Sequence, residues 1–374
     1  MQFIENFTPE LTISSPGRIN FIGEHTDYNM GYVLPTAIAN AITFKLARNG
    51  SQNMCNVYSM GYQGFCFDLN KISISNTEWQ NYILGVVNEL LKLTDKLRGF
   101  DCIIDSNLPL GSGLSSSAAM ECGLAFGLNE LFDLGLSKIM LVELSQRAEH
   151  SYVGTQCGIM DQFASVMSKE GKILLLDCRS MEYQHIPINI HPYKILMLNT
   201  KVSHNLASSE YNTRKQECEE GVSILKKRNP KINSLRDVTR EMLEVSKAEM
   251  NLTVYNRCSF IIDENKRVLE MADAFRKNKL EAVGSLLYEA HHGISKRYEV
   301  SCPESDFLVE FAKMNPSILG ARQTGGGFGG CTLNIIHEDA LEAFIPAATK
   351  AYYEKFNILL EAFEVAPSGG TSIQ

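Results

Sequence analysis

The sequence predicts an α+β fold built in two parts. Short apolar or alternating runs typical of strands are mixed with longer stretches of helical periodicity, without the strict strand–helix–strand rhythm of a doubly wound parallel sheet. The chain has 374 residues, of which 44% are hydrophobic, enough for two domains of about 100 to 200 residues each. Pro187 and Pro192 interrupt the pattern between two apolar runs. We therefore expect domains of residues 1–190 and 191–374.

The individual elements follow from hydrophobic periodicity and from capping residues. Strands are predicted at residues 41–47, 100–105, 171–176, 194–198 and 331–336. Helices are predicted at residues 81–93, 115–132, 137–152, 208–226, 257–277 and 341–356. The small residues at 369–372 are expected to form a frayed terminus.

The composition of the chain argues against two classes of function, nucleic-acid binding and membrane insertion. The net charge is −8 and the one dense basic run lies at 226–228, which argues against a nucleic-acid partner. No run approaches the roughly 20 apolar residues that span a bilayer, and the first residues do not resemble a secretory leader. The ten cysteines form no CxxC pair, so we expect reduced thiols. These observations predict a cytoplasmic protein that does not bind membranes.

A polar segment at residues 17–28 interrupts otherwise apolar sequence. It contains Arg18, Glu24, His25 and Asp27. Each of these side chains is costly to bury unless it is paired or faces a ligand. A surface loop after a strand is the alternative interpretation.

A second segment, at residues 108–120, leads through glycines into a helix of small residues. Gly111 and Gly113 allow the backbone to turn, and the helix start near Ser115 adds unpaired N–H donors and the positive end of a dipole. The segment therefore indicates an anion cradle with three serine hydroxyls, but not a Walker A loop, because no Gly-Lys-Ser/Thr follows. A Gly/Ser turn that caps a buried helix is the alternative.

A third segment, at residues 324–330, contains five glycines and formally matches GxGxxG. A dinucleotide-binding interpretation fails because a strand, not a helix, is predicted to follow it. The glycines instead suggest a backbone pressed close to a ligand or to another loop.

In this order the three segments resemble those of the GHMP small-molecule kinases, and residues 17–29 are similar to the galactokinase signature. Further similarity lies at residues 148–150, 157–163, 208–211 and 298–301. The resemblance implies a two-domain GHMP kinase fold with the active site in the interdomain cleft.

The activity implied by the resemblance is transfer of the ATP γ-phosphoryl group to the C1 hydroxyl of D-galactose, with Mg²⁺. The product would be α-D-galactose 1-phosphate, formed in the first step of galactose catabolism (the Leloir pathway), and the enzyme would be a monomer. The alternatives are a sister kinase for N-acetylgalactosamine or L-arabinose and a non-catalytic galactose sensor.

The resemblance also assigns the sugar site. Asp161 would face the C1 hydroxyl as base or orienting acceptor, and Arg18 beside it would keep that carboxylate ionised and counter charge on the phosphoryl oxygens. Asp27 would bind the C3 and C4 hydroxyls, and Glu24 with His25 would bind the C6 end of the sugar. The sugar-binding residues are then Arg18, Glu24, His25, Asp27, Gly158, Asp161 and Tyr211. A structural Arg18–Asp161 ion pair is the competing interpretation.

For the nucleotide, the resemblance places Trp79 near adenine and the glycine-serine segment around the phosphates. The implied nucleotide-binding residues are Trp79, Gly111, Ser112, Gly113, Leu114, Ser115, Ser116 and Ser117. Ser116 and Glu149 would be the Mg²⁺ ligands. Trp79 could instead be a buried core aromatic, and Glu149 a solvated helix charge.

Overall fold

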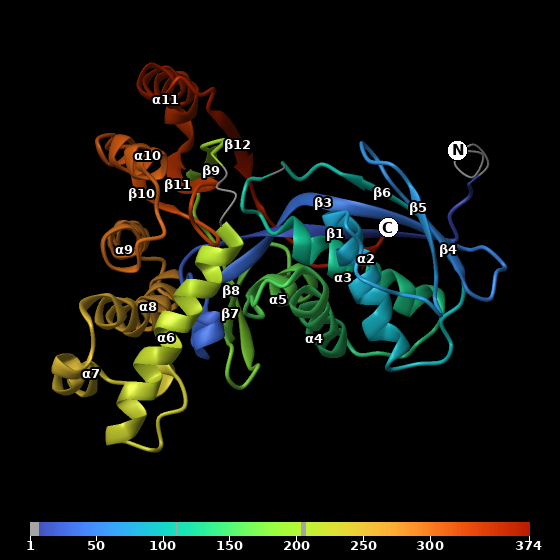
Figure 1. Ribbon diagram of the computed structural model, residues 1–374. Helices are drawn as coiled ribbons and strands as arrows, with labels where there is room; N and C mark the ends of the chain where they lie inside the picture. The colour runs from blue at the N-terminus through green and yellow to red at the C-terminus, as the bar shows by residue number, and fades with distance from the viewer. Residues whose placement is uncertain (1–6, 110, 203–206) are drawn as a thin grey trace.

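Three sheets organise the chain in the computed structural model, which describes residues 7–109, 111–202 and 207–374, with side chains from residue 210 onward in the last range (Figure 1). The largest sheet has the order β14-β1-β3-β6-β4-β5, with β13 paired to β3. Its strands are β1 (Leu11–Asn20), β3 (Pro35–Arg48), β4 (Met54–Ser59), β5 (Phe65–Asp68), β6 (Phe100–Ser106), β13 (Pro367–Ser368) and β14 (Ser372–Ile373).

Helices α2 to α5 cover one face of this sheet (Figure 1). Helix α3 packs closely on β1 and β3 because glycines face the sheet: a Cβ on Gly123 would lie 2.2 Å from Phe44 Cε2, and one on Gly127 2.3 Å from Leu46 Cδ1. The close packing fixes the start of α3, where the glycine-serine segment lies. The helices are α2 (Glu78–Leu91), α3 (Ser116–Leu131), α4 (Lys138–Ala148) and α5 (Met160–Met167).

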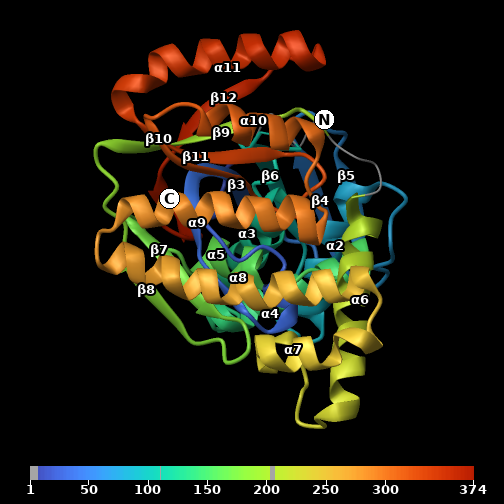
Figure 2. The ribbon, with the colours of Figure 1, turned by 90° about the vertical axis from the view of Figure 1, so that its left-hand side faces the viewer.

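Of the other two sheets, the three-stranded one belongs to the first half of the chain and the four-stranded one to the second half. The three-stranded sheet consists of β2 (Tyr32–Val33), β7 (Lys172–Asp177) and β8 (Tyr183–Pro187), and the four-stranded sheet of β9 (Tyr193–Asn199), β10 (Ile318–Gln323), β11 (Cys331–His337) and β12 (Glu361–Val365). The helices are α6 (Ala207–Arg228), α7 (Arg240–Ser246), α8 (Leu252–Arg276), α9 (Leu280–Gly293), α10 (Pro303–Lys313) and α11 (Leu341–Phe356). Figure 2 shows α8 and α9 side by side.

The predicted α+β class is confirmed, and each predicted strand and helix is present, although β3 begins six residues and α8 five residues before the predicted start. The helix predicted at 341–356 has those bounds. The helix predicted at 137–152 ends at Ala148 and continues as a π-helical turn, Glu149–Val153. Such turns are frequent at functional sites.

The chain crosses between sheets near the predicted domain boundary. It leaves the three-stranded sheet after β8 and enters the four-stranded sheet at β9. One buried apolar cluster nevertheless draws members from both sides, including Ile13, Ile173, Met197 and Leu333. The division at residue 190 therefore stays a prediction.

The expectation of a frayed terminus at 369–372 is wrong. Strands β13 and β14 return to the first sheet and pair with β3 and β1. Thr371 is 1% exposed, and its hydroxyl lies 3.0 Å from Ser15 Oγ and donates to the Ser165 carbonyl at 2.9 Å. Because these contacts join residues some 200 to 356 positions apart, local composition could not reveal them.

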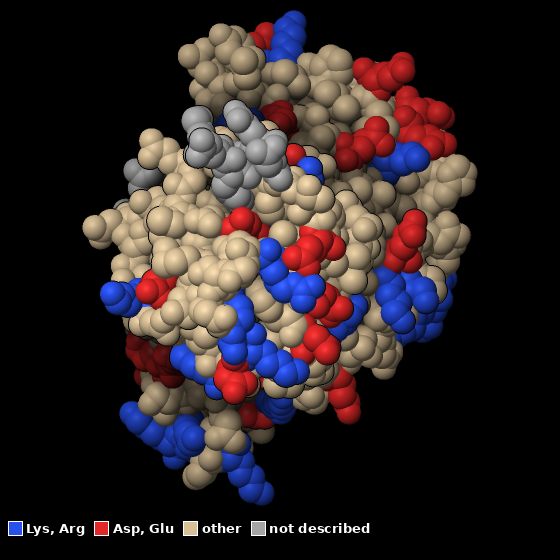
Figure 3. Space-filling model, turned by 90° about the vertical axis from the view of Figure 1, so that its right-hand side faces the viewer, with Lys and Arg blue, Asp and Glu red and all other residues tan. Residues whose placement is uncertain are grey.

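None of the described helices is both long and apolar enough to cross a membrane. On the face shown in Figure 3, Lys and Arg side chains are interspersed with Asp and Glu. All ten cysteines are unpaired, as the sequence predicted.

The buried tail makes a stability prediction. Thr371→Val keeps the volume but removes the hydroxyl that bonds Ser15 and Ser165, so we expect a loss of about 1–3 kcal/mol in unfolding free energy, measured by urea denaturation. Ser372→Ala, at an exposed neighbour, should change it by less than about 0.5 kcal/mol. Equal effects of the two substitutions would show that the tail is not anchored by Thr371.

Candidate active site

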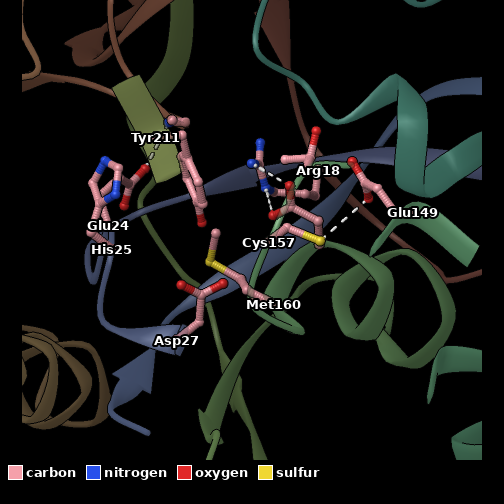
Figure 4. Close-up of a pocket in the computed structure, with 13 residues that line it drawn as sticks. Arg18, Glu24, His25, Asp27, Glu149, Cys157, Met160 and Tyr211 are labelled. Carbon is pink, nitrogen blue, oxygen red and sulfur yellow. Dashed lines mark hydrogen bonds and ion pairs between the residues drawn. The ribbon is translucent and has the colours of Figure 1, made fainter. Parts of the chain in front are cut away.

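A cavity of about 120 Å³ lies where the polar segment after β1 meets the start of α5, the start of α6 and the glycine-rich loop after β10 (Figure 4). Figure 4 shows Arg18 and Glu149 at one end of the cavity and Glu24 with His25 at the other. All seven predicted sugar-binding residues line it: Arg18, Glu24, His25, Asp27, Gly158, Asp161 and Tyr211. Glu149, Thr155, Cys157, Met160, Gly325 and Gly326 complete the lining.

Arg18 and Asp161 form a bidentate ion pair at one end of the cavity. Arg18 Nε donates to Asp161 Oδ1 at 2.7 Å and Nη2 to Oδ2 at 2.9 Å, while Nη1 donates to the Gly113 carbonyl at 2.7 Å. Asp161 is the second residue of helix α5. Its side chain keeps 28% of its surface exposed, so the carboxylate is held rigidly and still faces the cavity.

Ser115 supplies a third donor to the same carboxylate. Its hydroxyl donates to Asp161 Oδ2 at 2.5 Å instead of capping α3, and its backbone is left-handed, with φ 60° and ψ 51°. Such a conformation costs free energy in a residue other than glycine and recurs at functional sites. Ser115 therefore connects the start of α3 to Asp161.

Asp27 and Gly158 form one wall of the cavity. Asp27 is 8% exposed, and burial, with the charge of Asp161 as the second cause, raises the pKa of its carboxyl to about 7. A Cβ on Gly158 would lie 2.0 Å from Asp27 Oδ2, so only glycine fits beside this carboxylate.

Glu24 is bonded to the glycine-rich loop. Glu24 Oε1 accepts from the Gly325 N–H at 2.8 Å and from Thr324 Oγ1 at 3.2 Å, and it is ion-paired with Arg322, whose side chain is fully buried. The sequence analysis missed Arg322, although a charge inside an apolar strand requires a partner and was a signal for one. These contacts join the polar segment after β1 to strand β10.

His25 and Tyr211 form the aromatic end of the cavity. His25 is 3% exposed, and burial, followed by the charge of Arg214, lowers the pKa of its imidazole to about 3. Its ring centroid lies 5.2 Å from that of Tyr211 and 4.7 Å from that of Tyr298. A neutral imidazole among aromatic faces can bond a hydroxyl without adding charge.

The glycine-serine segment has the geometry expected of an anion cradle. Gly111 and Gly113 have φ values of 68° and 72°, and the first N–H groups of α3 have no side-chain cap. A Cβ on Gly325 would lie 3.1 Å from the Gly113 carbonyl oxygen, so the third glycine segment packs against the second, one of the two outcomes predicted. The side chains of Ser112 and Leu114 are buried, which leaves only their backbone for a ligand.

A second cavity, of about 270 Å³, begins beside the start of α3. It is lined by Trp79, Ser116 and Ser117 of the predicted nucleotide site, together with Ile42, Ser59, Met60, Tyr62, Tyr82, Ile104, Asp105, Ser106, Leu108 and Met120. Trp79 also packs on Tyr62 and Phe65, with ring centroids 5.5 and 5.2 Å away. Trp79 is therefore a packed aromatic that forms part of a cavity wall.

Glu149 lines the first cavity, but it is buried and is not a solvated helix charge. It is 6% exposed, and burial, followed by the charge of Asp161, raises the pKa of its carboxyl to about 7. Glu149 Oε2 accepts from Gln162 Nε2 at 2.8 Å and from Cys157 Sγ at 3.4 Å, and the Ser117 side chain lowers the pKa of the carboxyl in part. The described residues contain no group of three or more His, Cys, Asp or Glu suited to a metal.

The oxygen donors of Glu149 and Ser116 are of the kind that Mg²⁺ takes. A hard cation takes carboxylate and hydroxyl oxygens and keeps several waters, so it needs only one or two protein ligands. Glu149 lines the first cavity, and the exposed Ser116 lines the second. A cation there would also offset the burial of the neighbouring carboxylates Asp27 and Asp161.

The fold and the paired cavities define a GHMP small-molecule kinase. Residues 81–169 match the family "GHMP kinases N terminal domain" and residues 271–354 match "GHMP kinases C terminal". Residues 1–48 match the "Galactokinase galactose-binding signature".

Comparison with known proteins shows to which family of GHMP kinases the chain belongs. The chain is 39% identical to the galactokinase of Thermosipho africanus (strain TCF52B), over 97% of this chain and 99% of that protein. It is 38% identical to a galactokinase of Clostridium perfringens (strain SM101 / Type A), over 94% and 92%. The crystal structure of Lactococcus lactis galactokinase complexed with galactose superposes with a TM-score of 0.95 at 32% identity, covering 99% of this chain and 97% of that one. The chain belongs to the galactokinase family.

The lack of space between Gly158 and Asp27 leads to a prediction about sugar binding. Gly158→Ala places a methyl group on the Asp27 carboxylate and should weaken galactose binding at least about tenfold, measured by calorimetry. Gly369→Ala is the matched control, because a Cβ there meets no atom within 4 Å. Unchanged galactose affinity of Gly158→Ala would contradict the assignment of this wall to the sugar.

Proposed function

We propose that this protein transfers the γ-phosphoryl group of ATP to the C1 hydroxyl of D-galactose, giving α-D-galactose 1-phosphate and ADP. This reaction is the first step of galactose catabolism, the Leloir pathway. One observation carries the proposal: a single guanidinium, that of Arg18, bonds both the carboxylate at the end of the first cavity and the carbonyl of Gly113 in the anion cradle. A sugar in the first cavity and a nucleotide in the second would meet at this point.

The sugar would lie along the first cavity with C1 at the Arg18 end. Asp27 would accept hydrogen bonds from the C3 and C4 hydroxyls, and Gly158 leaves room for them. Glu24 and His25, at the opposite end, would meet C6, with Tyr211 beside the ring (Figure 4). Carboxylates suit vicinal hydroxyls because they accept several hydrogen bonds at once.

ATP would place its adenine in the second cavity near Trp79 and its phosphates at the start of α3. The backbone N–H groups of residues 111–117 and the positive end of the helix would hold the phosphate oxygens. Ser116 and Glu149 would hold Mg²⁺. When bound, the cation neutralises charge on the phosphate oxygens.

Asp161 would orient the C1 hydroxyl toward the γ-phosphorus. The C1 oxygen forms the new P–O bond, the bond to the ADP oxygen breaks, and the hydroxyl proton passes to Asp161. Three protein hydrogen bonds from Arg18 and Ser115 already bind this carboxylate, so we favour orientation with late proton transfer. Arg18 would counter negative charge on the transferred group.

Two further inferences concern the oligomeric state and the cellular compartment of the enzyme. We infer that the enzyme acts as a monomer, as the family resemblance implies. Ten unpaired cysteines, most of them buried, suit the reducing cytoplasm.

A sugar panel tests the reaction. With ATP and Mg²⁺, galactose should release ADP and give a C1 phosphate visible by ³¹P NMR, and EDTA should abolish this. L-Arabinose, which lacks the C6 group, should react more slowly, and N-acetylgalactosamine should be excluded by the small cavity. Faster turnover of N-acetylgalactosamine would indicate a sister kinase, and galactose binding without ADP release would indicate a sensor.

Asp161→Asn tests the catalytic assignment. The amide keeps the shape but loses the charge and the proton acceptor, so galactose binding should stay nearly intact while turnover falls at least ~100-fold. Asp273→Asn, which removes an exposed charge on α8, is the control and should behave like wild type. Near-normal turnover of Asp161→Asn would refute the role of this residue.

A further inference from the structure

A chain of hydrogen bonds runs from the sugar cavity into the core behind His25. His25 Nδ1 lies 2.9 Å from the Tyr28 hydroxyl, which lies 2.7 Å from the Tyr298 hydroxyl. The Tyr298 hydroxyl is 3.2 Å from Cys218 Sγ. Tyr298 and Cys218 are 0% and 1% exposed, so no water competes at the inner end. None of the roles assigned above uses Tyr28, Tyr298 or Cys218.

We propose that Tyr28 and Tyr298 are positioning residues that hold His25 in the tautomer with its proton on Nε2, so that His25 donates a hydrogen bond to the sugar. The inference deepens the proposed function and rests on it for the identity of the ligand.

The first step is that His25 is neutral. Burial, followed by the charge of Arg214, lowers the pKa of His25 to about 3, and Arg322 adds to this effect. A neutral imidazole has one donor nitrogen and one acceptor nitrogen, and the bond made by one decides the character of the other. Nδ1 is occupied by Tyr28, whereas Nε2 is buried without a hydrogen bond to any described residue.

The second step concerns the donor and the acceptor in each hydrogen bond of the series from Cys218 to His25. The Cys218 thiol is both a weak donor and a weak acceptor, so the direction is decided at the other end, where a phenol O–H is a good donor and a neutral imidazole nitrogen a good acceptor. The favourable order therefore starts at the Cys218 thiol: the thiol donates to Tyr298, Tyr298 to Tyr28, and Tyr28 to His25 Nδ1. The reverse order would end with a phenol donating to sulfur.

The neighbour of the His25 ring on the cavity side, Gly326, is consistent with a proton on Nε2. The backbone of Gly326 raises the pKa of His25 and so opposes part of the effect of burial. Gly326 and His25 line the same cavity, so a proton on Nε2 would be available to a ligand there.

The consequence concerns specificity. A fixed N–H requires an acceptor oxygen on the ligand, and the end of the cavity near His25 is the one assigned to C6 (Figure 4). A site that donates to a buried hydroxyl rejects an analogue without it, because the protein group is left unpaired. Tyr28 and Tyr298 would thus enforce recognition of the C6 hydroxyl without contacting it.

Steady-state kinetics of Tyr28→Phe and Tyr298→Phe test this with galactose and its 2-, 3-, 4- and 6-deoxy analogues. Tyr28→Phe should raise KM for galactose about tenfold with kcat within about twofold, and leave KM for 6-deoxygalactose unchanged. Tyr298→Phe should act in the same direction with a smaller effect. Tyr288→Phe is the matched control, because the Tyr288 hydroxyl is also buried but bonds no described residue.

Two outcomes would overturn the inference while galactose is still phosphorylated by wild type: an unchanged KM in Tyr28→Phe, or an equal rise for galactose and all four analogues. Absence of phosphorylation by wild type would instead refute the proposed function. The tautomer can be measured without activity, from the ¹⁵N shifts of the His25 ring in the intact protein. A proton on Nε2 supports the inference, and a proton on Nδ1 overturns it.

Discussion

The site depends on one guanidinium that serves two segments of the fold. Two N–H groups of Arg18 hold both oxygens of Asp161, and a third holds the Gly113 carbonyl. Because Arg18 is 3% exposed and lies on strand β1, which pairs with β3 and β14, it has little freedom to release either partner. These hydrogen bonds fix strand β1, helix α5 and the loop before α3 relative to one another. A reaction that depends on the positioning of its reactants requires such fixed geometry.

This precision has a cost in stability. Burial raises the pKa values of Asp27 and Glu149 to about 7, so ionising either carboxyl in the ligand-free protein is unfavourable. His25 and Ser115 both have left-handed backbones, with φ of 64° and 60°. Strain and buried charge gathered in one place are expected where ligands, here hydroxyl donors and a cation, supply the missing partners. The buried Arg322 offsets part of this cost by pairing with Glu24.

Much of the site could be predicted from the sequence because its chemistry is concentrated in short segments. Burying Glu24, His25 and Asp27 in an otherwise apolar segment costs free energy unless a ligand or a partner bonds them, so the run indicates a binding site. Glycines before a helix indicate a cradle of the size of a phosphate. What could not be predicted depends on contacts between distant segments. The partner of Glu24 lies almost 300 positions away, on β10, and the buried tail around Thr371 looks polar and mobile when its sequence is considered alone.

A crystal structure with galactose and a non-hydrolysable ATP analogue is the most direct test of the central claim. The account predicts the C1 hydroxyl within hydrogen-bond distance of Asp161, the γ-phosphate at the start of α3, and the Arg18 ion pair intact between them. A sugar with C1 directed toward His25, or a nucleotide bound away from residues 111–117, would contradict the account.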